Sequence, residues 1–223
     1  MKLFLTLILF CFLAAADAAA EHAFDGFELY YASRPGAIFH ASDKKAFRTD
    51  TDEMQRLQYV WQGTISGKKR SIVLSSDSFT IDGHHIPQAE ARRFTSEVPG
   101  ELGASTDLYV NESYVCIDGV AGSAAGSAVR HKQIYLLIEP FSITPRLFQL
   151  PGLFGSCTGL RLDEEKHIRF DEVKYRYAKG HDEAVGVIFS EFKIERGAFV
   201  DTNRRVSATF VEPENVYKFS LDP

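Results

Sequence analysis

A glycine-flanked cysteine is the feature of this sequence closest to a catalytic motif. Residues 155–159 read Gly-Ser-Cys-Thr-Gly, the outline of a nucleophile elbow whose central residue attacks a substrate carbonyl. That motif lies between a strand and a helix, and no helical pattern follows residue 159. The nucleophile must also be a free thiolate, which a disulfide at Cys157 would exclude. We therefore expect Cys157 to be structural, and we predict no catalytic residue.

Charged residues and histidines offer groups for proton transfer or metal binding. Residues 163–167 read Asp-Glu-Glu-Lys-His and directly precede a predicted strand, which is typical of a solvated hairpin tip. His84 and His85 are adjacent on another predicted strand, so their side chains point to opposite faces and cannot easily bind one metal. The sequence shows no recognisable spacing of further ligands. We therefore predict no metal site and no cofactor.

Three further motifs are incomplete or conditional. Residues 63–68 resemble a phosphate-binding loop that is one residue too short, and they join two predicted strands instead of opening a helix. Residues 50–53 begin like a calcium loop, but Gln55 stands where that loop requires glycine. Asn111-Glu112-Ser113 is a sequon for N-linked glycosylation, which matters if the host is a eukaryote.

Residues 1–20 read as a secretory signal peptide. They comprise Lys2, an apolar run over residues 3–16 and a small-residue cleavage site at Ala16-Asp17-Ala18. We therefore expect the mature chain to be secreted or periplasmic. Its length fits one large β domain or two small ones, and because no internal repeat or linker is evident we predict a single β-rich domain over residues 21–223.

Two cysteines remain once Cys11 is removed with the signal peptide. Cys116 and Cys157 are expected to form a disulfide, because exported proteins fold under oxidising conditions. The bridge would close a loop of about 40 residues and contribute on the order of 4 kcal/mol through chain entropy. A chain of this length can build a core without it, so we expect the bridge to fix one loop.

Composition argues against two classes of partner. The chain has 25 Lys and Arg residues against 30 Asp and Glu residues, a formal net charge of −5. A nucleic-acid partner would favour a basic surface, so we predict no such partner. After the signal peptide, no apolar run reaches the roughly 18 residues of a membrane helix, so we predict a soluble chain without a membrane span.

The dominant hydrophobic period is two, which is typical of β-strands. Predicted strands cover residues 26–32, 59–65, 71–74, 78–81, 84–86, 108–117, 132–138, 168–177, 184–194, 206–211 and 216–221. Asp82-Gly83 predicts a tight type I′ turn, and helical signals are confined to residues 42–57 and 88–94. We therefore predict a mainly β fold, an antiparallel β-sandwich or barrel-like sheet with one or two short helices.

The apolar phase shifts inside two of these predicted strands. In residues 168–177 the apolar side chains move from even to odd positions, and in residues 184–194 a similar shift occurs near Ser190. A β-bulge at Asp171-Glu172 would keep the first set on one face of the sheet.

The stretch over residues 141–160 is the candidate contact loop. Its prolines and glycines predict irregular backbone that carries six large apolar side chains: Phe141, Leu147, Phe148, Leu150, Leu153 and Phe154. These side chains either plug the end of a β core, which is the commoner arrangement, or form an exposed contact patch beside the small-residue segment 119–128. A patch fixed by Cys157 would be a pre-organised binding surface.

Export, one disulfide and the lack of a catalytic motif favour a secreted or periplasmic binding protein over an enzyme. Such a protein could be an inhibitor or immunity-type protein that contacts another protein of the envelope or extracellular space. A secreted hydrolase is one alternative, with candidate groups that converge only in the fold: His84, His85, Asp163, Glu165 and His167. A carrier of a small ligand, with an aromatic interior, is the other.

Overall fold

A computed structural model describes residues 23–96, 102, 105–120 and 124–223. The predicted signal peptide at residues 1–20 lies outside this range, as does part of the small-residue segment 119–128. Strands make up 57% of the structure and helices 11%, which confirms the mainly β fold class. No helix in the described residues is long and apolar enough to cross a membrane.

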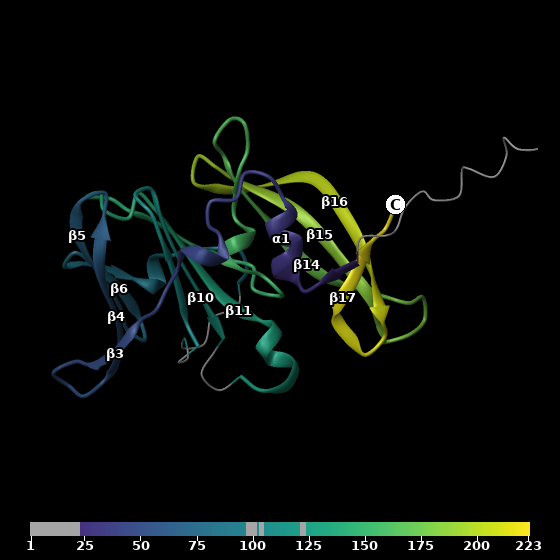
Figure 1. The fold of residues 1–223 in the computed structure, drawn as a ribbon, viewed down its shortest axis with the longest axis horizontal. Coiled ribbons are helices and arrows are strands. Elements are labelled where there is room, and N and C mark those ends of the chain that lie inside the picture. The colour runs from purple at the N-terminus through teal and green to yellow at the C-terminus, as the bar shows by residue number, and fades with distance from the viewer. Residues whose placement is uncertain (1–22, 97–101, 103–104, 121–123) are drawn as a thin grey trace, which may run out of the picture.

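The strands form three sheets, and a central sheet separates the other two (Figure 1). The strands of this central sheet lie in the order β2 (Lys44–Lys45), β9 (Asp107–Val110), β10 (Tyr114–Val120), β11 (Lys132–Ile138), β12 (Arg146–Leu150) and β8 (Arg92–Arg93). Along β10, Ile117 belongs to a core shared with one neighbouring sheet and Cys116 to a core on the opposite face. Both faces of the central sheet are therefore buried.

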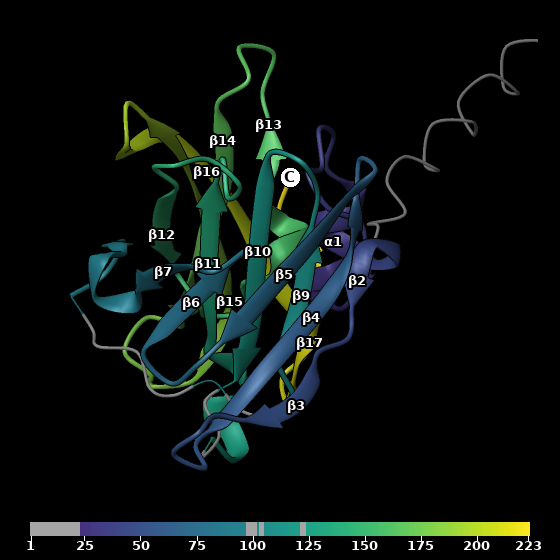
Figure 2. The same ribbon diagram turned by 90° about the vertical axis from the view of Figure 1, so that its left-hand side faces the viewer.

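An outer sheet of five strands covers the first face, and its strands cross those of the central sheet at an angle (Figure 2). Its order is β3 (Arg48–Thr51), β4 (Leu57–Ile65), β5 (Lys68–Leu74), β6 (Ser78–Ile81) and β7 (His84–Pro87). The predicted hairpin is confirmed: Asp82 and Gly83 join β6 to β7 with φ of 50° and 85°. Two positive φ angles are what a type I′ turn requires.

A curled sheet lies on the other side of the central sheet (Figure 1). Its order is β1 (Ala23–Asp25), β17 (Asn215–Leu221), β16 (Ala198–Glu212), β15 (Ala184–Glu195), β14 (Ile168–Tyr177) and β13 (Arg161–Leu162). The α-helix α1 (Phe27–Ser33) packs against this sheet. Short 3₁₀ helices complete the structure: η1 (Ala41–Asp43), η2 (Gln88–Glu90), η3 (Gly126–Arg130) and η4 (Cys157–Gly159).

The predicted bulge at Asp171-Glu172 is wrong. β14 pairs with β15 without a break from Ile168 to Arg176, so its two apolar sets face opposite sides of the sheet. Phe170 belongs to the core shared with the central sheet, whereas Val173 lies in the core under α1. The phase shift therefore marks a change of covering layer. The shift near Ser190 is an irregularity in the pairing of β15 with β16.

The helix α1 (Phe27–Ser33) lies where a strand was predicted over residues 26–32. Phe27, Tyr30 and Tyr31 are buried at helical spacing, and Leu29 is 56% exposed, whereas strand alternation puts it on one face with Phe27 and Tyr31. The apolar residues of this segment fit both the strand period of 2 and the helix period of 3.6. The helix forms because its apolar side covers one face of the curled sheet.

Two further predictions fail because Asx side chains build turns. Asp52 accepts backbone hydrogen bonds from Met54 at 2.9 Å and Arg56 at 2.8 Å, so after η1 ends at Asp43 the rest of residues 42–57 contains strands and a tight turn instead of a helix. Asn111 closes a turn in the same way and divides the predicted strand 108–117 into β9 and β10.

Candidate functional site

The Cys116–Cys157 disulfide is present, as predicted, and both residues are fully buried. It joins β10 of the central sheet to η4, the single 3₁₀ turn that Cys157 begins. The glycine-flanked cysteine therefore lacks both the α-helix of a nucleophile elbow and a free thiolate. Cys157 is therefore structural: its disulfide fixes η4 to the central sheet.

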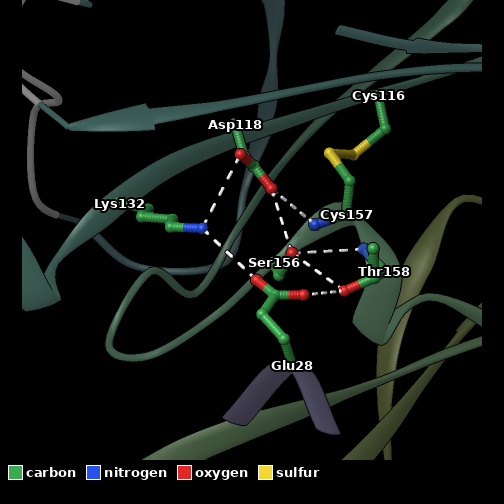
Figure 3. Close-up of a disulfide and its surroundings, with 7 residues drawn as sticks. All are labelled: Glu28, Cys116, Asp118, Lys132, Ser156, Cys157 and Thr158. Atoms are coloured by element: carbon green, nitrogen blue, oxygen red, sulfur yellow. Dashed lines mark hydrogen bonds and ion pairs between the residues drawn. A yellow bond between two sulfur atoms is a disulfide. The ribbon is translucent and has the colours of Figure 1, made fainter. Parts of the chain in front are cut away.

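A buried carboxylate lies beside this disulfide (Figure 3). Asp118 accepts hydrogen bonds from the backbone N–H of Cys157 at 2.8 Å and from the Ser156 hydroxyl at 3.2 Å. The Lys132 ammonium lies 3.8 Å from Asp118 and 3.6 Å from Glu28 of α1. Burial raises the pKa of Asp118, although Lys132 and the Cys157 N–H act in the opposite direction. These contacts hold η4 and α1 against the central sheet.

The candidate contact loop lies largely in the cores. Four of its six apolar side chains are buried and two are half-buried: Leu147, Phe148, Leu150 and Phe154, then Phe141 and Leu153. Residues 146–150 form β12, which pairs with β11, and Phe154 stacks on Phe27 of α1 with ring centroids 4.1 Å apart. The burial of these six side chains fits the plug interpretation, whereas residues 142–144 and 146 of the same stretch are exposed.

The candidate acid–base residues separate into two groups. His84 and His85 are exposed on β7, at the edge of the outer sheet. Asp163, Glu165 and His167 come together in the turn between β13 and β14, with His167 Nδ1 at 3.4 Å from Asp163 and 3.2 Å from Glu165. Three carboxylates of this turn, Asp163, Glu164 and Glu165, line a cavity of about 480 Å³.

This cavity lies against the β13 edge of the curled sheet and is lined by four arginines: Arg34, Arg161, Arg169 and Arg204. We call it the arginine cavity. Arg34 follows α1, and the other three come from β13, β14 and β16. The segment that carries Arg34 is held there because Gly36 accepts a backbone hydrogen bond from Leu162 of β13 at 2.8 Å. Gly36 has φ of 82° and would clash with Leu162 if it had a Cβ.

The floor of the arginine cavity, by which we mean Arg161, Arg169, Glu191 and the adjoining buried Asp171, is a set of like-charged cross-strand neighbours; Asp171 itself does not line the cavity. Arg161 of β13 lies opposite Arg169 of β14, and Asp171 of β14 lies opposite Glu191 of β15. Like charges in such positions repel. The diagonal contacts compensate, because Arg161 lies 3.0 Å from Asp171 and Arg169 lies 2.6 Å from Glu191. Arg161 also lies 3.4 Å from Glu191, so it neutralises both buried acids.

Glu191 is the centre of this arrangement. Its carboxylate lies within 4 Å of all four arginines and accepts a hydrogen bond from the Thr202 hydroxyl at 3.2 Å. Burial raises the pKa of Glu191, but the Arg169 hydrogen bond and the charges of Arg161 and Arg169 outweigh it, and the pKa is lowered. At its neighbour Asp171, burial outweighs Arg161 and Arg34, and the pKa is raised.

The four arginines differ in how much of each is open to a ligand. The side chain of Arg161 is 6% exposed and that of Arg169 is 20% exposed. Arg204 is 74% exposed, and its ion-pair contact within the described residues is Glu191 at 3.9 Å. Arg34 is 24% exposed; it donates to the Tyr30 hydroxyl and lies 3.6 Å from Glu191. Arg204 and, less fully, Arg34 are the guanidinium groups that an incoming anion can reach.

The turn residues Asp163, Glu165 and His167 place one ligand atom each within 4.8 Å of one another. Asp163 is already engaged, because its Oδ2 contacts the Arg169 guanidinium at 2.7 Å and its Oδ1 accepts the His167 N–H at 2.8 Å. A cation at this turn would face that guanidinium, so these residues fit a divalent ion poorly.

Sequence reasoning missed the residues of the cavity floor. The available signal was the pair of charges at odd positions of a predicted strand, Arg169 and Asp171, which a buried strand face does not tolerate without partners. Comparison of the chain with protein-family models, curated proteins and solved structures gives no match. Conclusions about function therefore rest on the geometry of the arginine cavity.

Proposed function

We propose that this protein is an exported β-rich binding protein that acts by contact with another protein of the envelope or extracellular space. An inhibitor or immunity-type protein acts in this way. The contact site in this proposal is the arginine cavity, which receives an acidic group of the partner. One observation carries the proposal: four arginines converge on a single buried carboxylate in a cavity of about 480 Å³ and leave Arg204 largely exposed.

The chemistry of the cavity supports an acidic side chain or a chain terminus as the group received. Guanidinium groups bind carboxylates through paired, charge-assisted hydrogen bonds, and water-poor surroundings strengthen them. The volume is suited to one or two side chains. The plug position of residues 141–160 supports moving the contact site from that stretch to this cavity.

A capture experiment tests the proposal. The mature chain, immobilised through its C-terminus, is exposed to extracellular or envelope material of its host, and bound proteins are identified by mass spectrometry. The matched variants are Arg204→Gln in the cavity and Arg196→Gln, which removes the same charge from an exposed turn outside it. Loss of one charged hydrogen bond, worth about 1.5–3 kcal/mol, should weaken binding roughly 10- to 100-fold for Arg204→Gln alone.

Two results would count against this assignment. A partner held equally by both variants would bind elsewhere on the surface. If the wild-type chain retains no protein at all, the proposal of a protein partner fails. An affinity measured for the purified partner in rising salt gives a second check, because binding through an exposed arginine should weaken as salt is added.

A secreted hydrolase is the second candidate, and one observation favours it. Asp171 and Glu191 are cross-strand neighbours, of which Glu191 lines the arginine cavity and Asp171 is buried beside it, and their pKa values move in opposite directions. Paired carboxylates of unequal proton affinity are typical of general acid–base catalysis. Under this alternative Asp171→Asn would abolish turnover of a substrate while binding persisted. The aromatic rings that suggested a small-ligand carrier pack against one another, as Phe27 does on Phe154.

A further inference from the structure

The sequon at Asn111 forms the exposed turn between β9 and β10. Asn111 Oδ1 accepts the backbone N–H of Ser113 at 3.0 Å and of Tyr114 at 2.9 Å, which closes an Asx turn. Glu112 and Ser113 are exposed at its tip. The side-chain oxygen of Asn111 is therefore occupied by the turn, while its amide nitrogen makes no hydrogen bond to any described residue.

An open hollow of about 470 Å³ is lined in part by Asn111, Glu112 and Ser113 of this turn. Four half-buried apolar side chains contribute to its wall: Ile38, Ile65, Tyr114 and Leu162. Sugar rings present C–H faces that pack on such surfaces, and their hydroxyls remain in water. The turn thus combines an unengaged amide with room and a matching surface for a carbohydrate.

We propose that Asn111 is the acceptor of an N-linked oligosaccharide whose first sugars lie over this hollow. In a eukaryotic secretory pathway, where this sequon is used, the donor is a polyprenyl-pyrophosphate-linked oligosaccharide. The Asn111 amide nitrogen bonds to C1 of the first sugar and gives up one proton, and the C1–O bond breaks to release the polyprenyl pyrophosphate. The serine hydroxyl of the sequon is required by the transferase, and Glu112 satisfies the exclusion of proline between them.

The geometry gives the finished protein a stable place for the modification. Attachment at the amide nitrogen leaves Oδ1 free to keep both turn hydrogen bonds, so the β9–β10 hairpin needs no rearrangement. Asn203-Arg204-Arg205 and Asn215-Val216-Tyr217 lack the hydroxyl residue, so Asn111 lies in the chain's one complete sequon.

The test is expression of the full chain in a eukaryotic secretory cell, followed by intact mass and peptide mapping before and after treatment with a peptide N-glycosidase. One arm uses residues 1–20 as the leader, and a second arm replaces them with an established secretion leader. The expected result is a mass excess removed by the glycosidase, with aspartate appearing at position 111. Asn111→Asp keeps the turn acceptor and should abolish the excess, as should Ser113→Ala, whereas Ser113→Thr should retain it.

Asn215→Asp is the matched control, because Asn215 also accepts a backbone N–H two residues ahead, at 3.2 Å, without a sequon. It should carry the full mass excess. Secreted protein without glycan in both arms overturns the proposal. A glycan in the second arm alone supports Asn111 as the acceptor and contradicts export by residues 1–20. Failure of the acceptor site and failure of the leader therefore give different results.

Discussion

Replacing Arg161 with methionine should be the most damaging single change in the arginine cavity. The side chain is 6% exposed and lies 3.0 Å from Asp171 and 3.4 Å from Glu191, whose own side chains are 2% and 7% exposed. At an effective dielectric constant of about 20, each contact is worth on the order of 5 kcal/mol before desolvation. Removing one partner of a buried ion pair costs about 3–5 kcal/mol net. Among the described residues, Asp171 would keep only the Arg34 guanidinium, at 3.8 Å, whereas Glu191 would keep Arg34, Arg169 and Arg204.

A double-mutant cycle separates this electrostatic effect from lost packing. In Arg161→Met the two acids face each other across β14 and β15, so Asp171→Asn in the same chain should recover about 2 kcal/mol. Arg196→Met makes the same change at an exposed turn and should cost less than about 0.5 kcal/mol. Free energies of unfolding come from urea titrations followed by far-ultraviolet circular dichroism and Trp61 fluorescence.

The pH dependence of the variant supplies an independent readout. Arg161 lowers the pKa of Asp171, which burial already raises, so its removal should raise that pKa further. When the pKa of a carboxyl is higher in the folded than in the unfolded state, the protein becomes less stable as the pH rises through the folded pKa, because the buried group must then ionise. The deficit of Arg161→Met should therefore be small near pH 4 and grow towards pH 7. A deficit below about 1 kcal/mol at pH 7, or a double variant no more stable than the single one, would refute the reasoning.

Three other predictions concern the rest of the molecule. Replacing both Cys116 and Cys157 with alanine should lower the free energy of unfolding by about 4 kcal/mol, measured in urea, because a bridge over 41 residues restricts the unfolded chain. Asp118→Asn should gain stability relative to wild type as the pH rises from 4 to 7, because burial raises the pKa of Asp118 above 3.8; equal pH profiles would contradict this. Phe148→Ala should lower the free energy of unfolding by about 3–5 kcal/mol, whereas Ile143→Ala, at a position 91% exposed, should hardly change it. If residues 141–160 formed a contact patch instead, both changes would weaken partner binding and leave stability nearly unchanged.

Much of the strand content could be predicted because single segments carried unambiguous local signals. Residues 132–138 and 168–177 coincide with β11 and β14, and Asp82-Gly83 fixed the β6–β7 hairpin. Local signals failed where one segment fitted two periods, as Phe27 to Tyr31 did. They also failed where a side chain built a turn, because Asn111 was read as a modification motif but not as the end of a strand.

The arginine cavity could not be predicted, because its residues become neighbours only through strand register. Asp171 and Glu191 are 20 positions apart in the sequence and face each other only when β14 and β15 pair as they do. The even-to-odd shift around Asp171 was interpreted as a bulge because one buried face was assumed. The assumption of one buried face is wrong because the curled sheet is covered on both faces, by α1 on one and by the central sheet on the other.

Stability and recognition in the arginine cavity depend on different arginines. Arg161 and Arg169 are held by buried acids at 3.0 Å and 2.6 Å, so an incoming anion would have to displace a carboxylate to reach them. Arg204 lies 3.9 Å from Glu191 and is mostly exposed to solvent, so this ion pair is weak. Arg204 can therefore bind an incoming anion without losing a strong ion pair. A change at Arg161 should therefore act on folding first, and a change at Arg204 on binding alone. Asp171 and Glu191 then serve to orient the arginines, and this structural role accounts for the two buried acids without acid–base catalysis.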